Sequence, residues 1–143
     1  MNAVFVANLA VAWFLTGLIW TIQVVHYPLF SFVGDRFCDY EDRHKRRIGY
    51  IVGPTMSIEL VAAALLVWRR PSFVEPWIAA TSLGLVVLIW ISTAALQAPC
   101  HAKLSQGFDA AVERRLTMTN WIRTAAWTIR ASLLSAALVD ALR

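Results

Sequence analysis

Long apolar stretches separated by polar segments dominate the sequence. Four of them are long enough to cross a hydrocarbon core of about 30 Å, which takes roughly 20 helical residues. They cover residues 3–25, 50–68, 77–96 and 121–142. None shows the alternation of apolar and polar positions that marks the strands of a membrane barrel. The pattern therefore predicts an all-α fold, a single transmembrane domain over residues 1–143 in which four helices form a bundle.

The connections between these stretches predict how the helices are arranged. Residues 69–76 form a short connection, so the second and third helices should be antiparallel neighbours. The connections 26–49 and 97–120 are long, and both would lie as loops at the opposite end of the bundle. Within the second of these loops, Asp109 is a plausible N-cap for a helix that leads into the fourth stretch.

The composition supports a membrane protein. Hydrophobic residues make up 59% of the chain and charged residues 15%, against about 45–50% and about 25% in soluble domains. No charged residue precedes Asp35. The fourth stretch is the least apolar because it carries Arg123, Arg130 and Asp140. Small residues after Arg130 nevertheless suit close helix packing in lipid.

The basic residues predict an orientation in the membrane. The net charge is +4, and most of the Lys and Arg residues lie in the two long connections, beside apolar stretches. Membrane topology accounts for them there, so a nucleic-acid partner is not expected. The bias predicts a multi-pass protein of a cell inner membrane, with both long loops cytoplasmic and both termini outside.

Two features of the long loops follow from this orientation. Cys38 and Cys100 would then stay as thiols. The charges at 39–47 are interpreted as a collar facing solvent and lipid headgroups.

Polar side chains gather at the loop end of the predicted bundle. They are Gln23, His26, Tyr27, Gln97, His101, Asn120 and Arg123, and His44 lies on the same side. Glu59 and Arg130 each lie nine residues into their stretches, roughly 14 Å along a helix. A charge at that depth costs about 2.5–3.5 kcal/mol, so we expect the two to face inward and pair, or to line a wet cavity. Trp127 shares a helix face with Arg123 and Arg130.

These residues suit more than one kind of chemistry. A metal site would take nitrogen and oxygen ligands from His26, His44, Glu59 and His101 for iron, copper or zinc, and a haem would take His26 and His101 as axial ligands. Without a cofactor, the catalytic groups would be His26, Glu59, His101 and Arg123. The substrate-binding groups would be Gln23, Tyr27, Gln97, Asn120, Trp127 and Arg130. Interfacial histidines also serve as headgroup contacts or helix caps.

Two segments in the second half of the chain resemble a known family. The sequences Gln-Ala-Pro-Cys-His-Ala-Lys-Leu at 97–104 and Asn-Trp-Ile-Arg at 120–123 are similar to small four-helix bacterial membrane proteins related to anthrone oxygenases. The chain departs from that pattern at His101, where an amide side chain is expected. The resemblance implies oxidation of a lipophilic aromatic substrate, with Asn120, Arg123 and His101 in the pocket.

Three functions are compatible with these features. The first is a membrane oxidoreductase or oxygenase that acts on a lipophilic small molecule, aromatic or quinone-like, taken from the membrane lipid. The second is a proton-coupled transport subunit with Glu59 and Arg130 as its relay, which would need to form a homo-oligomer. The third is a non-catalytic subunit of a larger membrane complex.

Overall fold

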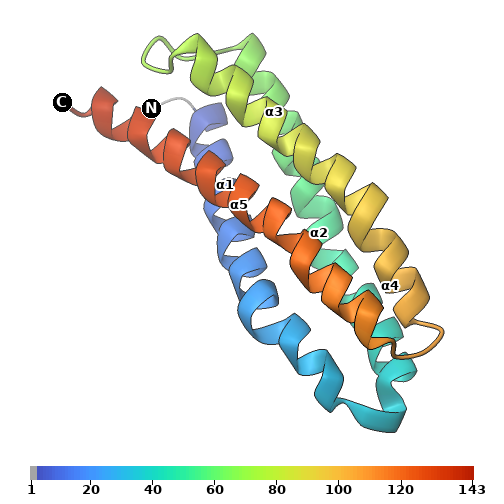
Figure 1. The fold of residues 1–143 in the computed structure, drawn as a ribbon. Helices are drawn as coiled ribbons and strands as arrows, with labels where there is room; N and C mark the ends of the chain where they lie inside the picture. The colour runs from blue at the N-terminus through green and yellow to red at the C-terminus, as the bar shows by residue number, and fades with distance from the viewer. Residues whose placement is uncertain (1–2) are drawn as a thin grey trace.

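The protein is an all-α bundle of four long helical rods, as predicted. The computed structural model describes residues 3–143, and no strand occurs in this range. The first rod begins with α1 (Ala3–Thr21), the second is α2 (Phe37–Trp68), the third begins with α3 (Pro76–Ser92) and the fourth is α5 (Ala110–Ala141). The start of α1, the end of α5 and the short connection between α2 and α3 lie at one end of the bundle, and the two long connections lie at the other (Figure 1).

Three of the rods are long and apolar enough to cross a membrane. They are Ala3–Phe32, Gly34–Trp68 and Pro76–Leu104, which makes the chain a membrane protein. The fourth rod, α5, does not reach that level of apolarity, because it carries the charged residues noted above. It nevertheless packs along both α1 and α3, and its crossing of the membrane remains a prediction.

The long connections are mostly helical, contrary to the prediction of loops. Residues after α1 continue as a π-helical turn, η1 (Ile22–His26), and two 3-10 segments, η2 (Tyr27–Phe32) and η3 (Gly34–Arg36). After α3 come a second π-helical turn, η4 (Thr93–Gln97), and α4 (Ala98–Leu104). Charged residues do not prevent helix formation outside the membrane, and apolar residues among them pack against the bundle. The predicted N-cap is confirmed, because the Asp109 side chain accepts from two backbone amides of α5.

The two π turns place polar groups against α5. A π turn widens the helix and redirects the side chains that follow it. Each of these turns contains one buried glutamine, Gln23 in η1 and Gln97 in η4, and each glutamine hydrogen-bonds α5. The ends of the first and third apolar stretches therefore adopt similar local structures at the loop end of the bundle.

The second rod extends beyond the membrane. With 32 residues, α2 is about 48 Å long at 1.5 Å per residue, which exceeds a hydrocarbon core of about 30 Å. Its charged residues cluster between Asp39 and Arg47. The first turns of α2, up to about Gly49, therefore lie outside the membrane-spanning part, next to η1, η2 and α4. This helical extension forms one wall of the candidate site.

Candidate functional site

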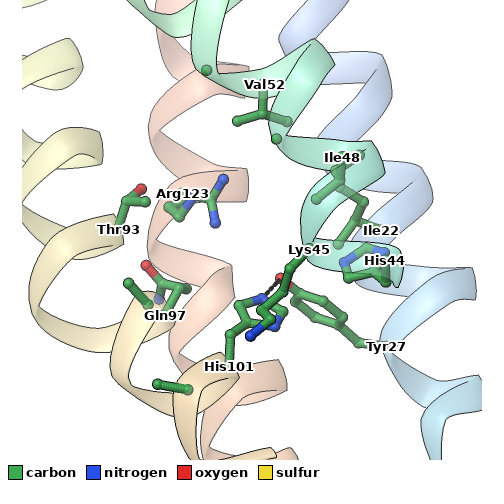
Figure 2. Close-up of a pocket in the computed structure, with 14 residues that line it drawn as sticks. Ile22, Tyr27, His44, Lys45, Ile48, Val52, Thr93, Gln97, His101 and Arg123 are labelled. Carbon is green, nitrogen blue, oxygen red and sulfur yellow. Dashed lines mark hydrogen bonds between the residues drawn. The ribbon is translucent and has the colours of Figure 1, made fainter. Parts of the chain in front are cut away.

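A cavity of about 390 Å³ lies at the loop end of the bundle, between α2 on one side and η4 and α4 on the other (Figure 2). That volume is in the range of small-molecule sites, about 300–1,000 Å³. Half of the residues that line it are apolar or small. Seven polar side chains also line it: Tyr27, His44, Lys45, Thr93, Gln97, His101 and Arg123. The cavity thus combines apolar walls with a few polar groups, as ligand sites commonly do.

One side of the cavity is bordered by a chain of three hydrogen-bonded side chains. The Tyr27 hydroxyl lies 3.1 Å from His101 Nε2, and His101 Nδ1 lies 2.5 Å from a carboxylate oxygen of Glu41. An ionised carboxylate only accepts, so the neutral imidazole donates from Nδ1 and its Nε2 accepts the Tyr27 proton. Glu41 is fully buried. A buried carboxylate that orients an imidazole in this way prepares it to take up a proton.

Arg123 contributes a buried positive charge to the cavity. Arg123 is only 6% exposed, and its guanidinium stacks on the Trp127 ring, 5.1 Å from the ring centroid. Within residues 3–143 it forms no ion pair and its Nε has no hydrogen-bond partner, and the polar group that its guanidinium does meet is the Tyr27 hydroxyl. Burying a cation without a counter-ion is costly. An anionic or carbonyl oxygen of a ligand in the cavity would offset that cost.

The predicted substrate-binding residues divide into two groups. Tyr27 and Gln97 line the cavity, and the Gln97 amide is held by Ser92 at 3.0 Å and Thr119 at 3.2 Å. Gln23 and Asn120 do not line it. Instead the Asn120 amide donates to Gln23 Oε1 at 2.8 Å, which ties the first rod to α5. These two amides therefore form a packing contact between helices, and a contact of either with a ligand remains a prediction.

Glu59 and Arg130 form the predicted pair. Arg130 Nη1 lies 3.0 Å from Glu59 Oε1, and the Trp127 indole also donates to the Glu59 carboxylate at 3.0 Å. Arg130 Nη2 donates to Asn8 Oδ1 at 2.6 Å. Glu59, Arg130 and Asn8 are fully buried, and none of them lines the cavity. The cluster is sealed inside the bundle, so it contributes to packing and charge balance rather than to the site.

The three histidines lie near one another, and each of them hydrogen-bonds a neighbouring side chain. His26 Nε2 is 2.8 Å from His44 Nδ1, while His101 bonds Glu41 and Tyr27. His44 lies in the extramembrane part of α2, where burial, aided by the two neighbouring histidines, lowers its pKa to about 3. It is therefore neutral at physiological pH.

Of the four residues predicted as metal ligands, the three histidines lie near one another and Glu59 lies apart from them. Glu59 bonds Arg130 and Trp127 and contacts no histidine. In the part of the chain that the structure describes, no three His, Cys, Asp or Glu side chains are placed to hold a metal ion. His26 and His101, the predicted haem ligands, hydrogen-bond different partners.

Glu41 belongs to the charged stretch 39–47, which the sequence predicts to be a collar facing solvent, although Glu41 and His44 also have the Glu-x-x-His spacing of some metal sites. The collar interpretation is wrong for this residue, because Glu41 is fully buried and bonds His101. The signal was a helical stripe, since Phe37, Glu41, His44 and Ile48 follow one another at spacings of four, three and four residues. Phe37 and Glu41 are buried and the other two are half-buried, so the stripe faces the bundle. The first turns of α2 are therefore an amphipathic helix, which the many charged residues of 39–47 make hard to recognise in the sequence.

No family model, curated protein or solved structure matches the chain. The resemblance to proteins related to anthrone oxygenases therefore remains a prediction from two short segments.

Proposed function

We propose that the protein is a membrane enzyme that binds a lipophilic molecule through an ionisable oxygen and removes a proton from it. The observation that supports this most directly is the position of the Tyr27–His101–Glu41 chain. It reaches the same cavity as Arg123, a buried cation without a carboxylate partner within residues 3–143. One side of the cavity suits a proton acceptor and another suits the anion that proton loss leaves behind.

The proposed proton transfer uses only side chains that are already in contact. A hydroxyl of the ligand gives its proton to the Tyr27 oxygen while Tyr27 passes its own proton to His101 Nε2. The Glu41 carboxylate stabilises the imidazolium that forms. The ligand is left as an oxyanion, and the Arg123 guanidinium stabilises the negative charge on its oxygen. Gln97 is placed to hold a second polar group of the same ligand.

Oxidoreductase or oxygenase activity is the narrower proposal. An aromatic oxyanion gives up electrons more readily than its neutral form, and dioxygen is the oxidant that an oxygenase would use. With an anthrone, a ring CH₂ group becomes a carbonyl: one oxygen atom of dioxygen enters the product and the other leaves as water. This reaction balances without an added reductant. The similarity of 97–104 and 120–123 to the family named above supports this class.

The rim of the cavity suggests how such a ligand would enter. Gly49 and Gly53 of α2 line it on one side, and Ala98 and Ala102 of α4 line it on the other. All four residues are exposed, and no atom lies within 4 Å of a Cβ built on either glycine. We propose that the ligand enters sideways from the bilayer through this slot, and that its flat rings lie between the two walls of small residues.

The other functions receive less support. A transport relay through Glu59 and Arg130 would need access to water, whereas both residues are fully buried and line no described cavity. A non-catalytic subunit remains the alternative if the cavity binds ligand without turnover. For the membrane itself we propose a cell inner membrane with the cavity at the cytoplasmic end, because Lys and Arg are concentrated there.

Turnover of a hydroxyanthrone by the purified protein in detergent tests the proposal, with dioxygen uptake and quinone absorbance as readouts. We expect His101→Gln and Tyr27→Phe each to lower the rate by about 100-fold, the usual contribution of a general base. Tyr50→Phe is the matched control, because Tyr50 is 73% exposed and does not line the cavity. Full activity in the His101 variant would overturn the mechanism. Binding without turnover in the unmodified protein would favour the subunit alternative.

A further inference from the structure

A second groove lies on the extramembrane part of α2, separate from the ligand cavity. Its volume is about 380 Å³. Tyr40, Arg43 and Arg47 of α2 line its polar part, together with His26 of η1. Ile48 and Ile51 line its apolar part. The groove needs no role in catalysis, although His44 and Ile48 contribute to the walls of both the groove and the cavity.

The charges of this groove are of one sign. Arg43 and Arg47 are four residues apart, so they lie one above the other on the same helix face. Neither forms an ion pair within residues 3–143, and no Asp or Glu lines the groove. The nearest acidic residues along α2 do not line the groove: Asp42 pairs with Lys45, Glu41 is buried against His101, and Asp39 lines a neighbouring groove that Arg43 also borders.

The groove also changes character along its length. From Arg43 to Ile51 is eight residues, or about 12 Å of helix. Over that distance the lining passes from guanidinium groups to branched apolar side chains, and Ile51 is 45% exposed. The change falls where the charged part of α2 meets its apolar, membrane-spanning part. A molecule that fits both ends must itself be anionic at one end and apolar at the other.

We propose that this groove binds the headgroup of an anionic phospholipid. Arg43 and Arg47 contact the phosphate, because guanidinium groups match phosphate oxygens in geometry and charge. The first carbons of an acyl chain lie along Ile48 and Ile51. A zwitterionic lipid is disfavoured, since the groove offers its ammonium group no carboxylate. The bound lipid would hold the start of α2 at the membrane surface, next to η1.

Native mass spectrometry of the detergent-purified chain with added phosphatidylglycerol or phosphatidylcholine tests this site. We expect the unmodified protein to retain phosphatidylglycerol in preference to phosphatidylcholine. The double variant Arg43→Gln/Arg47→Gln should lose about 10- to 30-fold in affinity for phosphatidylglycerol, as expected for two basic contacts at a membrane surface. The matched control is Arg114→Gln/Arg115→Gln, which removes the same charge from exposed positions of α5 that do not line the groove.

The outcomes separate this site from its alternatives. Equal losses in the two double variants would mean that net charge alone attracts the lipid, and equal retention of both lipids would remove the headgroup preference. Either result overturns the proposal. A third arm adds inorganic phosphate. If millimolar phosphate displaces the lipid and protects the protein from heat as well as the lipid does, the ligand is free phosphate and the lipid proposal fails. None of these measurements depends on turnover, so they stand apart from the proposed enzyme function.

Discussion

The two buried arginines of α5 differ in their partners, and this difference predicts opposite effects on stability. Arg123 lies beneath the cavity with its guanidinium on Trp127 and has no ion-pair partner within residues 3–143. Arg123→Met removes an uncompensated charge and keeps much of the side-chain volume. We therefore expect an unchanged or higher melting temperature, together with loss of hydroxyanthrone binding. A strongly destabilised variant would show that an interaction within the protein already satisfies the guanidinium.

Arg130 is the internal control for that comparison. It bonds Glu59 and Asn8 deep in the bundle, and all three residues are fully buried. Arg130→Met leaves the Glu59 carboxylate without its counter-ion, so we expect a loss of about 3–5 kcal/mol in unfolding free energy. Adding Glu59→Gln should restore part of that loss, because it removes the unpaired charge. Denaturation in mild detergent measures both variants. Equal stabilities for the single and double variants would argue against the pair.

At the scale of elements, α2 and α4 form the walls of the cavity, and the small residues at its rim set the width of the slot. Gly53→Leu places a branched side chain at this rim, where the glycine leaves open space. We expect at least a tenfold weaker binding of hydroxyanthrone with little change in folding. Gly84→Leu is the matched control, since Gly84 is an exposed helical glycine with open space around it that does not line the cavity. Titration calorimetry in detergent distinguishes the two variants.

An equal effect of both leucine substitutions would show that the loss reflects helix distortion rather than a blocked slot. Unchanged binding in the Gly53 variant would mean that ligands reach the cavity by another route. Gly53 precedes Pro54 within α2, so the circular dichroism of this variant should be recorded alongside its binding.

How far the sequence predicts these elements depends on the signal that each one carries. Hydropathy alone predicts the first three rods, the apolar and small residues around Arg130 predict the fourth, and the depth of Glu59 and Arg130 predicts their pairing. The helical start of α2 is not predicted, because the many charged residues in this segment lower its mean hydropathy and hide the stripe of four inward-facing residues. The two π turns are not predicted either, since nothing in the residue types of 22–26 or 93–97 distinguishes a π-helical turn from an α-helical one. The segments that the sequence does not predict, the start of α2 and the π turns, all contribute to the walls of the cavity.

For the molecule as a whole, polar contacts along α5 hold the bundle together. The Trp13 indole donates to Ser135, the Trp20 indole donates to Thr128, and both bonds join α1 to α5. In lipid the hydrophobic effect does not drive helices together, so such bonds and close packing carry the association. The fourth rod is the least apolar of the four, and the polar residues that make it so include those that form these contacts. Its inward-facing polar groups are compatible with a position inside the membrane.

The predicted crossing by α5 has a direct consequence for topology. If all four rods span, the number of crossings is even and both termini lie on the same side. If α5 lies at the surface, only three segments cross and the termini lie on opposite sides. The concentration of Lys and Arg in the long connections predicts that these connections lie in the cytoplasm. We therefore expect a C-terminal alkaline phosphatase fusion to be active and a fluorescent protein fused there to be dark.

Fusions within the connection between α4 and α5, near Gly107, provide the opposite expectation: a fluorescent reporter and an inactive phosphatase. Fluorescence at both positions would mean that α5 does not cross. The reversed pattern, with active phosphatase near Gly107, would invert the whole bundle and put the cavity on the outer face. Cys38 and Cys100, both free thiols, would then lie on an oxidising side, so the same fusions also decide which redox environment surrounds the site.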